Sequence, residues 1–272
     1  MALIDNLVSW WTLDEFSNGS GAVTREDSHS SNDLTDNNTT PSATGIISLG
    51  ADFESTNSEY LSITDAAQTG LDITGDFSIS CWIKLESAYG VDTQSGIVNK
   101  GGQGGGDGNG YGLFGANLGG TSYVRFYTVN GGTLDIHNFT QTLSTATWYN
   151  IIGRFRSSDK AFDVAVNAVD KTQQTGTVNP GNSSNGFAIG ASNAGSGGNF
   201  FDGIIDEVGI WNRRLTDAEI DELYNSGAGI TYSDFATVGP SNLKTYNTNL
   251  KANIKTMNTN PIANVKTFNT NA

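Results

Sequence analysis

Residues 201–223 read FDGIIDEVGIWNRRLTDAEIDEL. The first half of this stretch is the last part of a long region in which apolar and polar residues alternate. Such alternation indicates β-strands. The second half contains a capping box, because Thr216 stands at the N-cap position and Glu219 follows three residues later. A helix over residues 216–226, ended by Gly227, is therefore predicted directly after the last strand.

The same alternation runs through the earlier part of the chain, most clearly in residues 76–85, 148–155 and 161–169. Each run is bounded by Gly, Asn, Asp or Ser, which is typical of antiparallel sheets with one buried face. The residues expected on the buried faces are Phe77, Ile79, Cys81, Ile83, Leu85, Tyr149, Ile151, Phe155, Phe162, Val164 and Val166.

Composition narrows the class of protein further. The 272 residues include 34 glycines and only 4 prolines, which favours many tight turns, and one all-β domain takes about 200–250 residues. The net charge of −14 argues against nucleic acid and against an anionic membrane surface as partners. Cys81 is the single cysteine of the chain, which excludes an intramolecular disulfide. The first eight residues do not resemble a signal peptide, so synthesis in a cytosol or prior removal of a signal is expected.

Several segments together resemble a laminin-G-like domain of the concanavalin A-like superfamily. The opening strand at residues 7–15, the strand at 77–84 and the hairpin at 97–113 resemble the corresponding family segments. The closing strand and helix at 201–223 are the most specific part of this likeness. The resemblance implies that residues 1–235 form an all-β, antiparallel, two-sheet jelly-roll sandwich with one short C-terminal helix.

Catalysis is predicted to be absent. Retaining glycosidases need two carboxylates about 5 Å apart on one face, and no strand identified from the sequence carries such a cluster. The adjacent Asp206 and Glu207 are expected to point to opposite faces of their strand. His29 and His137 are isolated in the sequence, with no nucleophile motif around them.

A calcium site follows from the family resemblance. Family members often hold one Ca²⁺ between an early Asp-Ser-rich loop and the aspartate of the closing strand. Asp27 and Asn32 match the loop, with His29 and one inserted residue departing from it, and Asp206 matches the closing strand. Carboxylate and amide oxygens suit calcium. The alternative is that Asp27 and Asn32 form Asx-turns and that Asp206 caps a loop.

One aromatic residue is a candidate for glycan binding. Trp82 shares the polar face of its strand with Ser78, Ser80 and Lys84. An exposed indole there would give a sugar a face to stack on. The alternative is that a covering segment packs over Trp82.

The composition changes after about residue 236. The body carries 28 acidic and 10 basic residues, or −18, whereas the tail at 236–272 has four lysines and no acid. The segments at 244–249, 255–260 and 266–271 repeat every eleven residues. An extended tail is favoured over a helix, and its repeats resemble segments of phage structural proteins. The apolar residues expected to mediate assembly are Leu243, Tyr246, Leu250, Ile254, Met257, Val265 and Phe268.

Two functions remain open from the sequence. The first is a non-catalytic assembly subunit on a virion surface, present in several copies, which displays the sandwich and is anchored to neighbouring subunits by the basic tail. The second is an extracellular, carbohydrate-binding adhesion module of a microbial surface. The repetitive tail favours the first, and an aromatic-lined sugar site would favour the second.

Overall fold

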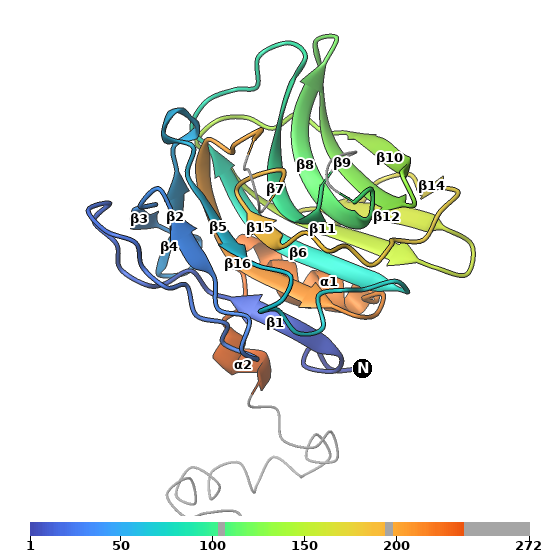
Figure 1. Ribbon diagram of the computed structural model, residues 1–272, viewed down its shortest axis with the longest axis horizontal. Coiled ribbons are helices and arrows are strands. Elements are labelled where there is room, and N and C mark those ends of the chain that lie inside the picture. The colour runs from blue at the N-terminus through green and yellow to red at the C-terminus, as the bar shows by residue number, and fades with distance from the viewer. Residues whose placement is uncertain (103–106, 194–197, 237–272) are drawn as a thin grey trace, which may run out of the picture. The chain divides into compact units, whose positions relative to one another are not determined.

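The computed structural model describes residues 1–102, 107–193 and 198–236, and these form two antiparallel sheets packed face to face (Figure 1). The first, sheet A, has the strand order β13-β12-β11-β6-β16-β4-β3, with β1 paired to β16 and β14 to β12. Its strands are β1 (Leu7–Trp11), β3 (Ser42–Thr44), β4 (Leu49–Phe53), β6 (Phe77–Leu85), β11 (Trp148–Arg156), β12 (Ala161–Val166), β13 (Val169–Asp170), β14 (Gln174–Thr175) and β16 (Gly203–Trp211).

The second sheet, sheet B, has the order β10-β9-β8-β7-β15-β5-β2. Four of its strands, β7 to β10, follow one another in both sequence and space, so they form a meander of hairpins. The strands are β2 (Thr35–Asn37), β5 (Tyr60–Ile63), β7 (Thr93–Gly101), β8 (Gly110–Leu118), β9 (Thr121–Asn130), β10 (Thr133–Thr140) and β15 (Phe187–Ile189). The prediction of an antiparallel two-sheet sandwich is confirmed.

The predicted helix follows the last strand. Helix α1 (Asp217–Tyr224) begins with the expected capping box: the Thr216 side chain accepts from the Glu219 N–H, and the Glu219 carboxylate accepts from the Thr216 N–H. The 3₁₀ turn η2 (Asn225–Gly227) continues it. Two short elements were not predicted, the 3₁₀ turn η1 (Ser55–Asn57) and helix α2 (Tyr232–Ala236).

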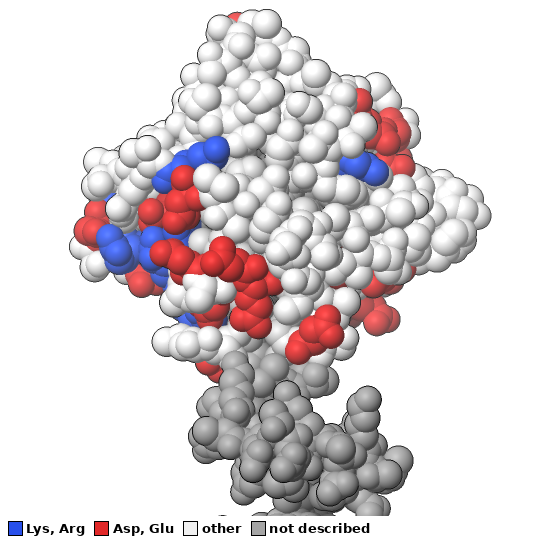
Figure 2. All heavy atoms as spheres, turned by 180° about the vertical axis from the view of Figure 1, so that it is seen from behind, with Lys and Arg blue, Asp and Glu red and all other residues white. Residues whose placement is uncertain are grey.

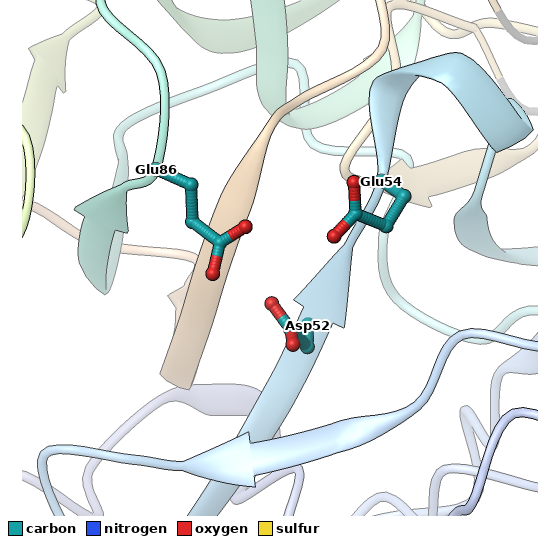
Figure 3. Close-up of side chains that lie close together, drawn as sticks. All are labelled: Asp52, Glu54 and Glu86. Atoms are coloured by element: carbon teal, nitrogen blue, oxygen red, sulfur yellow. The ribbon is translucent and has the colours of Figure 1, made fainter.

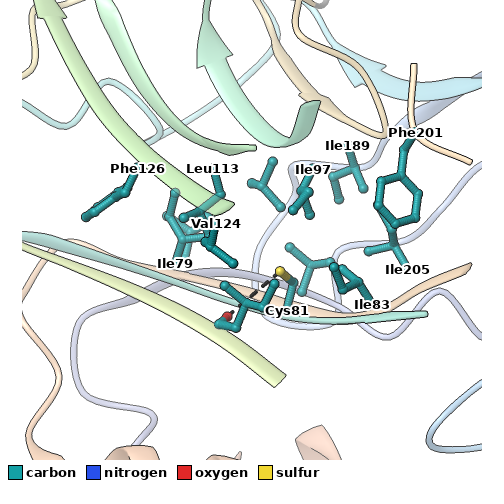
Figure 4. Packing of buried hydrophobic residues seen from close by; sticks show 14 of the residues in the cluster. Ile79, Cys81, Ile83, Ile97, Leu113, Val124, Phe126, Ile189, Phe201 and Ile205 are labelled. Atoms are coloured by element: carbon teal, nitrogen blue, oxygen red, sulfur yellow. Dashed lines mark hydrogen bonds between the residues drawn. The ribbon is translucent and has the colours of Figure 1, made fainter. Parts of the chain in front are cut away.

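The main core lies between the two sheets (Figure 4). The alternating apolar residues of β6, β11 and β12 all point into it, as the periodicity predicted. The expectation of a single buried face is wrong for β6, however. Its outer residues Ser78, Ser80 and Trp82 are also buried, because α1 and the segment after it cover the outer face of sheet A. Trp82, for example, stacks on Tyr224, with the ring centroids 5.8 Å apart.

A second apolar cluster holds α1 against this outer face. It contains Trp10 and Trp211 from the sheet and Ile220, Leu223 and Phe235 from the C-terminal segment. The rings of the two tryptophans meet edge to face, with centroids 5.9 Å apart. Sheet A is therefore packed on both sides, and the polar alternation of its central strands marks the face under α1 rather than a solvated face.

Acidic residues outnumber basic ones among the charged residues of the chain. Figure 2 shows the face opposite to that of Figure 1, where acidic side chains gather in a patch and basic side chains lie at its edge. The described residues form no continuous basic patch on this face, as expected from the charge of the sequence. Within the same residues, no helix is both long and apolar enough to cross a membrane.

Candidate functional site

A pocket of about 200 Å³ opens at one end of the sandwich. Three segments that are far apart in the sequence form it: η1, the stretch from the last residue of β6 to the first residues of β7, and the residues that precede β16. Its wall combines two aromatic side chains, several hydroxyl groups and one carboxylate. The lining residues are Ser55, Leu85, Ser87, Ala88, Tyr89, Gly90, Thr93, Gln94, Ser95, Phe200 and Asp202.

Tyr89 is the best-fixed aromatic residue of the pocket. Its hydroxyl shares a 2.7 Å hydrogen bond with the Ser95 hydroxyl, and its carbonyl accepts from Asn117 Nδ2 at 3.2 Å. A Cβ on Gly115 would lie 2.2 Å from the Tyr89 hydroxyl, so only glycine at that position lets the ring sit against β8. The ring is therefore held in place before any ligand binds.

Asp202 is the single carboxylate among the described residues of the pocket wall. Its Oδ1 accepts hydrogen bonds from the Ser55 N–H at 3.2 Å and from the Ser55 hydroxyl at 3.0 Å. Burial alone would raise the pKa of Asp202, but hydrogen bonds from Ser87 and Ser55 hold that pKa below its ordinary value. The pocket wall therefore carries a negative charge at neutral pH.

Three more carboxylates gather beside the pocket. Side-chain oxygens of Asp52, Glu54 and Glu86 all lie within 4.8 Å of one another, and Figure 3 shows the three groups facing a common point. Ser55 and Ser87, which line the pocket, directly follow Glu54 and Glu86 in the chain. Burial, and then repulsion from neighbouring acids, raises the pKa of all three carboxylates. We call Asp52, Glu54 and Glu86 the acidic trio.

The acidic trio was missed in the sequence. No strand identified from the sequence carried such a cluster, because Asp52 lies in β4 and Glu54 directly follows it. β4 was not recognised as a strand, since its short run of apolar residues is weakly alternating. Glu86 comes from the end of β6, which only the fold brings alongside β4 across β16.

Asp206 and Glu207 lie on the same face of sheet A, which corrects the prediction of opposite faces. Ile205 and Val208 both pack into the core between the sheets. A bulge in β16 separates them, with Glu207 at φ 48°, and so both acids point to the outer face. Asp206 is 0% and Glu207 2% exposed, and Glu207 Oε2 accepts from Trp10 Nε1 at 2.6 Å. No substrate reaches this pair.

The residues proposed for calcium all accept or make hydrogen bonds within the chain. Asp27 Oδ2 accepts from the Asn32 N–H at 3.2 Å, so these two are neighbours. Asp206 Oδ2 instead accepts from the N–H groups of Ile46 and Ile47, at 2.8 and 3.1 Å. These hydrogen bonds are the ones that the loop-capping alternative describes, and the calcium site stays a prediction.

Trp82 is not the sugar platform that its strand position suggested. Its side chain is 3% exposed and stacks on Tyr224, which leaves no free face for a ligand. The aromatic residues of the pocket, Tyr89 and Phe200, were not identified from the sequence. The one local signal was the tyrosine within the small-residue connection at 86–90. The seven apolar residues of the tail lie outside the described residues.

Comparisons with known proteins agree with this architecture. A family model described as "Concanavalin A-like lectin/glucanases superfamily" matches residues 55–221, which is more than half of the chain. No curated protein sequence matches the chain.

Solved structures with the same fold include domain 4 of an extracellular arabinanase from Geobacillus stearothermophilus in complex with arabinotriose. It shares 16% identity and a TM-score of 0.57, and the match covers 83% of this chain and 98% of that domain. A binding domain of Botulinum neurotoxin DC in complex with SialylT shares 11% identity and a TM-score of 0.58, over 82% of this chain and 52% of that one. Trypanosoma rangeli sialidase shares 18% identity and a TM-score of 0.56, over 83% and 34%. At such identities the likeness concerns the fold alone, and this chain spans only part of the two larger structures.

Proposed function

Since this chain belongs to the concanavalin A-like lectin/glucanases superfamily, we propose that it is a non-catalytic carbohydrate-binding module whose pocket beside Tyr89 and Asp202 holds a sugar. The observation that carries this proposal is the make-up of the pocket. Aromatic side chains and hydroxyl groups in one concave site are what sugar rings need, because the rings stack on aromatic faces and hydrogen-bond through their hydroxyls.

The size of the pocket indicates the kind of ligand. Its volume of about 200 Å³ is below the ~300–1,000 Å³ of sites that enclose drug-sized molecules. A terminal sugar of a longer glycan fits this space better than an internal stretch of a chain. Structures with the same fold have been solved with arabinotriose and with SialylT, which supports a sugar as the ligand class.

The site supports binding of a sugar without cleavage of its glycosidic bond. Glycoside hydrolysis uses two carboxylates that flank the bond to be broken. The pocket wall contains one carboxylate, Asp202. The acidic trio lies beside the pocket rather than among its lining residues, and the acids of β16 are buried.

Replacing Tyr89 with alanine is expected to weaken glycan binding at least tenfold, because it removes the fixed aromatic wall. A glycan array with neutral, amino and sialylated sugars identifies the ligand, and calorimetry then measures its affinity. Phe200→Ala removes the other aromatic side chain of the pocket and serves as the test if the Tyr89 variant unfolds, which thermal melting reports.

The matched control for this test is Phe16→Ala. Phe16 is 73% exposed and does not line the pocket, so its loss should leave the affinity unchanged. Glycan binding that survives both Tyr89→Ala and Phe200→Ala in folded protein would show that the sugar binds elsewhere.

A second candidate function comes from the tail, and it is compatible with glycan binding. The eleven-residue repeat spaces seven large apolar residues along a segment of charge +4, next to a body of charge −18. Segments that stay disordered usually lack such residues. This pattern supports an assembly role, in which copies of the chain join each other or other subunits of a virion or another extracellular surface.

Deleting residues 237–272 is expected to abolish oligomer formation while the sandwich keeps its thermal stability. The repeated apolar residues proposed to join subunits all lie in the deleted segment, whereas the residues of both main apolar clusters lie within residues 1–236. Light scattering gives the molar mass of the two proteins, and differential scanning fluorimetry compares their melting temperatures. A truncated chain with the same molar mass as the full chain would remove the tail from assembly.

A further inference from the structure

We infer that the free edge of β10 is the surface to which the tail of a second copy of the chain binds, as an added β-strand. This inference rests on the assembly role proposed for the tail and names the surface that the tail binds. It is drawn from the place of β10 at the end of sheet B, from the backbone groups on its free edge, and from the residue pattern of the tail.

β10 is the longest of the four strands at the ends of the two sheets (Figure 1). The strand orders end at β13 and β3 in sheet A and at β10 and β2 in sheet B. β13 has two residues, β3 and β2 have three each, and β10 has eight. Short length, proline and lysine are what usually protect an edge strand from pairing with another chain. β10 contains neither proline nor lysine, so its edge stays open to one more strand.

The backbone groups on this edge are those that an added strand needs. The turn between β9 and β10 consists of Gly131 and Gly132, and a two-residue turn is closed by a hydrogen-bonded residue pair. From that pair on, every second residue of β10 bonds to β9. The N–H and C=O groups of residues 134, 136, 138 and 140 therefore point to the free edge.

Among the described residues, these edge groups have one hydrogen-bond partner. The Asn138 carbonyl accepts from Gln174 Nε2 at 2.9 Å, which agrees with an outward direction of that carbonyl. The other N–H and C=O groups of the set form no hydrogen bond within the same residues. A row of unpaired backbone groups is a template for strand addition, in which the main chain supplies most of the affinity.

The two faces of β10 differ in chemistry. Ile136 packs against the small apolar cluster on the outer face of sheet B, and Leu134, on the same face, is 39% exposed. Asp135 and His137 lie on the other face, where their side chains form an ion pair at 3.0 Å. One face of the edge is therefore aliphatic, and the other carries a carboxylate.

The repeats of the tail match this difference between the faces. Neighbouring residues of a strand point to opposite faces of the sheet. A repeat that places its aliphatic residue beside Leu134 and Ile136 therefore places its lysine on the side of Asp135. Each repeat contains such a pair, an aliphatic residue directly followed by a lysine: Leu243-Lys244, Ile254-Lys255 and Val265-Lys266.

Length, composition and charge agree with this occupant. A repeat of eleven residues is long enough to cover the eight residues of β10 and to leave a short connection. The tail is rich in threonine and carries Tyr246 and Phe268, and these residue types favour strands. Its charge of +4 meets a body of −18, which favours encounter between copies. Three equivalent repeats allow one tail to join more than one neighbour.

The test is Ile136→Pro in the full chain. Proline removes the N–H that points to the free edge and puts its ring there, whereas the hydrogen bonds to β9 come from other residues. We expect light scattering to show a fall in molar mass from that of an oligomer to that of one chain, 28.7 kDa. Ile136→Val keeps the N–H and should keep the oligomer. If thermal melting shows that Ile136→Pro unfolds, Leu134→Pro makes the same change at an exposed residue.

Two outcomes would overturn the inference while leaving assembly intact. The first is a folded proline variant that keeps the molar mass of the wild-type oligomer, because the tail would then bind elsewhere. The second is a chain without residues 237–272 that stays an oligomer until Ile136→Pro is added, because β10 would then pair with itself. A wild-type chain with the molar mass of one chain would instead remove the joining of copies itself, and this inference with it.

Discussion

Glu207→Gln is expected to make the protein more stable than the wild type at pH 9, by about 2 kcal/mol or more, and close to it at pH 5. Burial raises the pKa of Glu207 to about 9, and the charge of Asp206 adds to this. Burial likewise raises the pKa of Asp206 to about 8, against the hydrogen bonds that it accepts from backbone N–H groups. The pair is therefore protonated in the folded protein at pH values where the unfolded chain has lost both protons.

The sign of the effect follows from proton linkage. Between about pH 4 and pH 9 the folded state binds more protons than the unfolded state, so the free energy of unfolding falls as the pH rises. The contribution of this pair is complete below the unfolded pKa values and is lost as the pH passes through the folded ones. Each group changes stability by about 1.4 kcal/mol per pH unit within its window. Glutamine removes one such group and can still accept the hydrogen bond from Trp10.

Urea unfolding followed by tryptophan fluorescence at pH 5, 7 and 9 measures this prediction. Glu222→Gln, on the exposed side of α1, is the control for the same amide substitution and should follow the wild-type pH profile. A Glu207→Gln protein that is less stable than the wild type at pH 9, or that shows the wild-type pH profile, would contradict the assignment of a buried, protonated pair.

Arg213→Met is expected to lower the free energy of unfolding by about 3–5 kcal/mol, because it leaves a buried carboxylate without its partner. The guanidinium forms a two-bond ion pair with Glu219, at 2.9 and 2.7 Å. It also donates to the carbonyls of Asp5 at 2.6 Å and Ala2 at 3.0 Å. One side chain thus joins α1, the end of β16 and the N-terminal segment.

The double variant Arg213→Met/Glu219→Gln should recover part of the loss, since it no longer buries an unpaired charge. Arg156→Met is the matched control: Arg156 forms an ion pair with Asp159, but in an exposed position, where such pairs contribute little. Denaturant midpoints of the three variants distinguish the loss of a buried ion pair from the loss of an exposed one. If Arg213→Met unfolds at the wild-type midpoint, the ion pair is not what attaches α1.

The sandwich and α1 could be predicted because their signals are local. The alternation in residues 77–85 specifies which side chains enter the core, and the capping box at Thr216 specifies where the helix begins. Local signals could not predict that the second face of sheet A is covered by α1. Ser78, Ser80 and Trp82 have the pattern of a solvated face, and only the packing of α1 shows that they are buried.

The candidate site was beyond prediction for a related reason. The pocket takes its residues from η1, from the connection after β6 and from the segment before β16, and no single segment carries a recognisable motif. The bulge that brings Asp206 and Glu207 to one face also left no sequence signal, because strand periodicity assigns adjacent residues to opposite faces. The family likeness identified the architecture, whereas the metal ligands that it implies stay a prediction.

The central place of β16 has a consequence for how the chain acquires its structure during synthesis. One edge of β16 pairs with β6, and the other pairs with β4 and then β1. These three strands therefore lack a pairing partner until β16, near the end of residues 1–236, has been synthesised. Contacts of such high sequence separation slow folding. The hairpins β7 to β10 need only local contacts and are free to form early. A nascent chain that stops short of residue 203 leaves strand edges of sheet A unpaired, and unpaired edges promote aggregation. Folding yield in the cell is therefore expected to depend on the synthesis of β16.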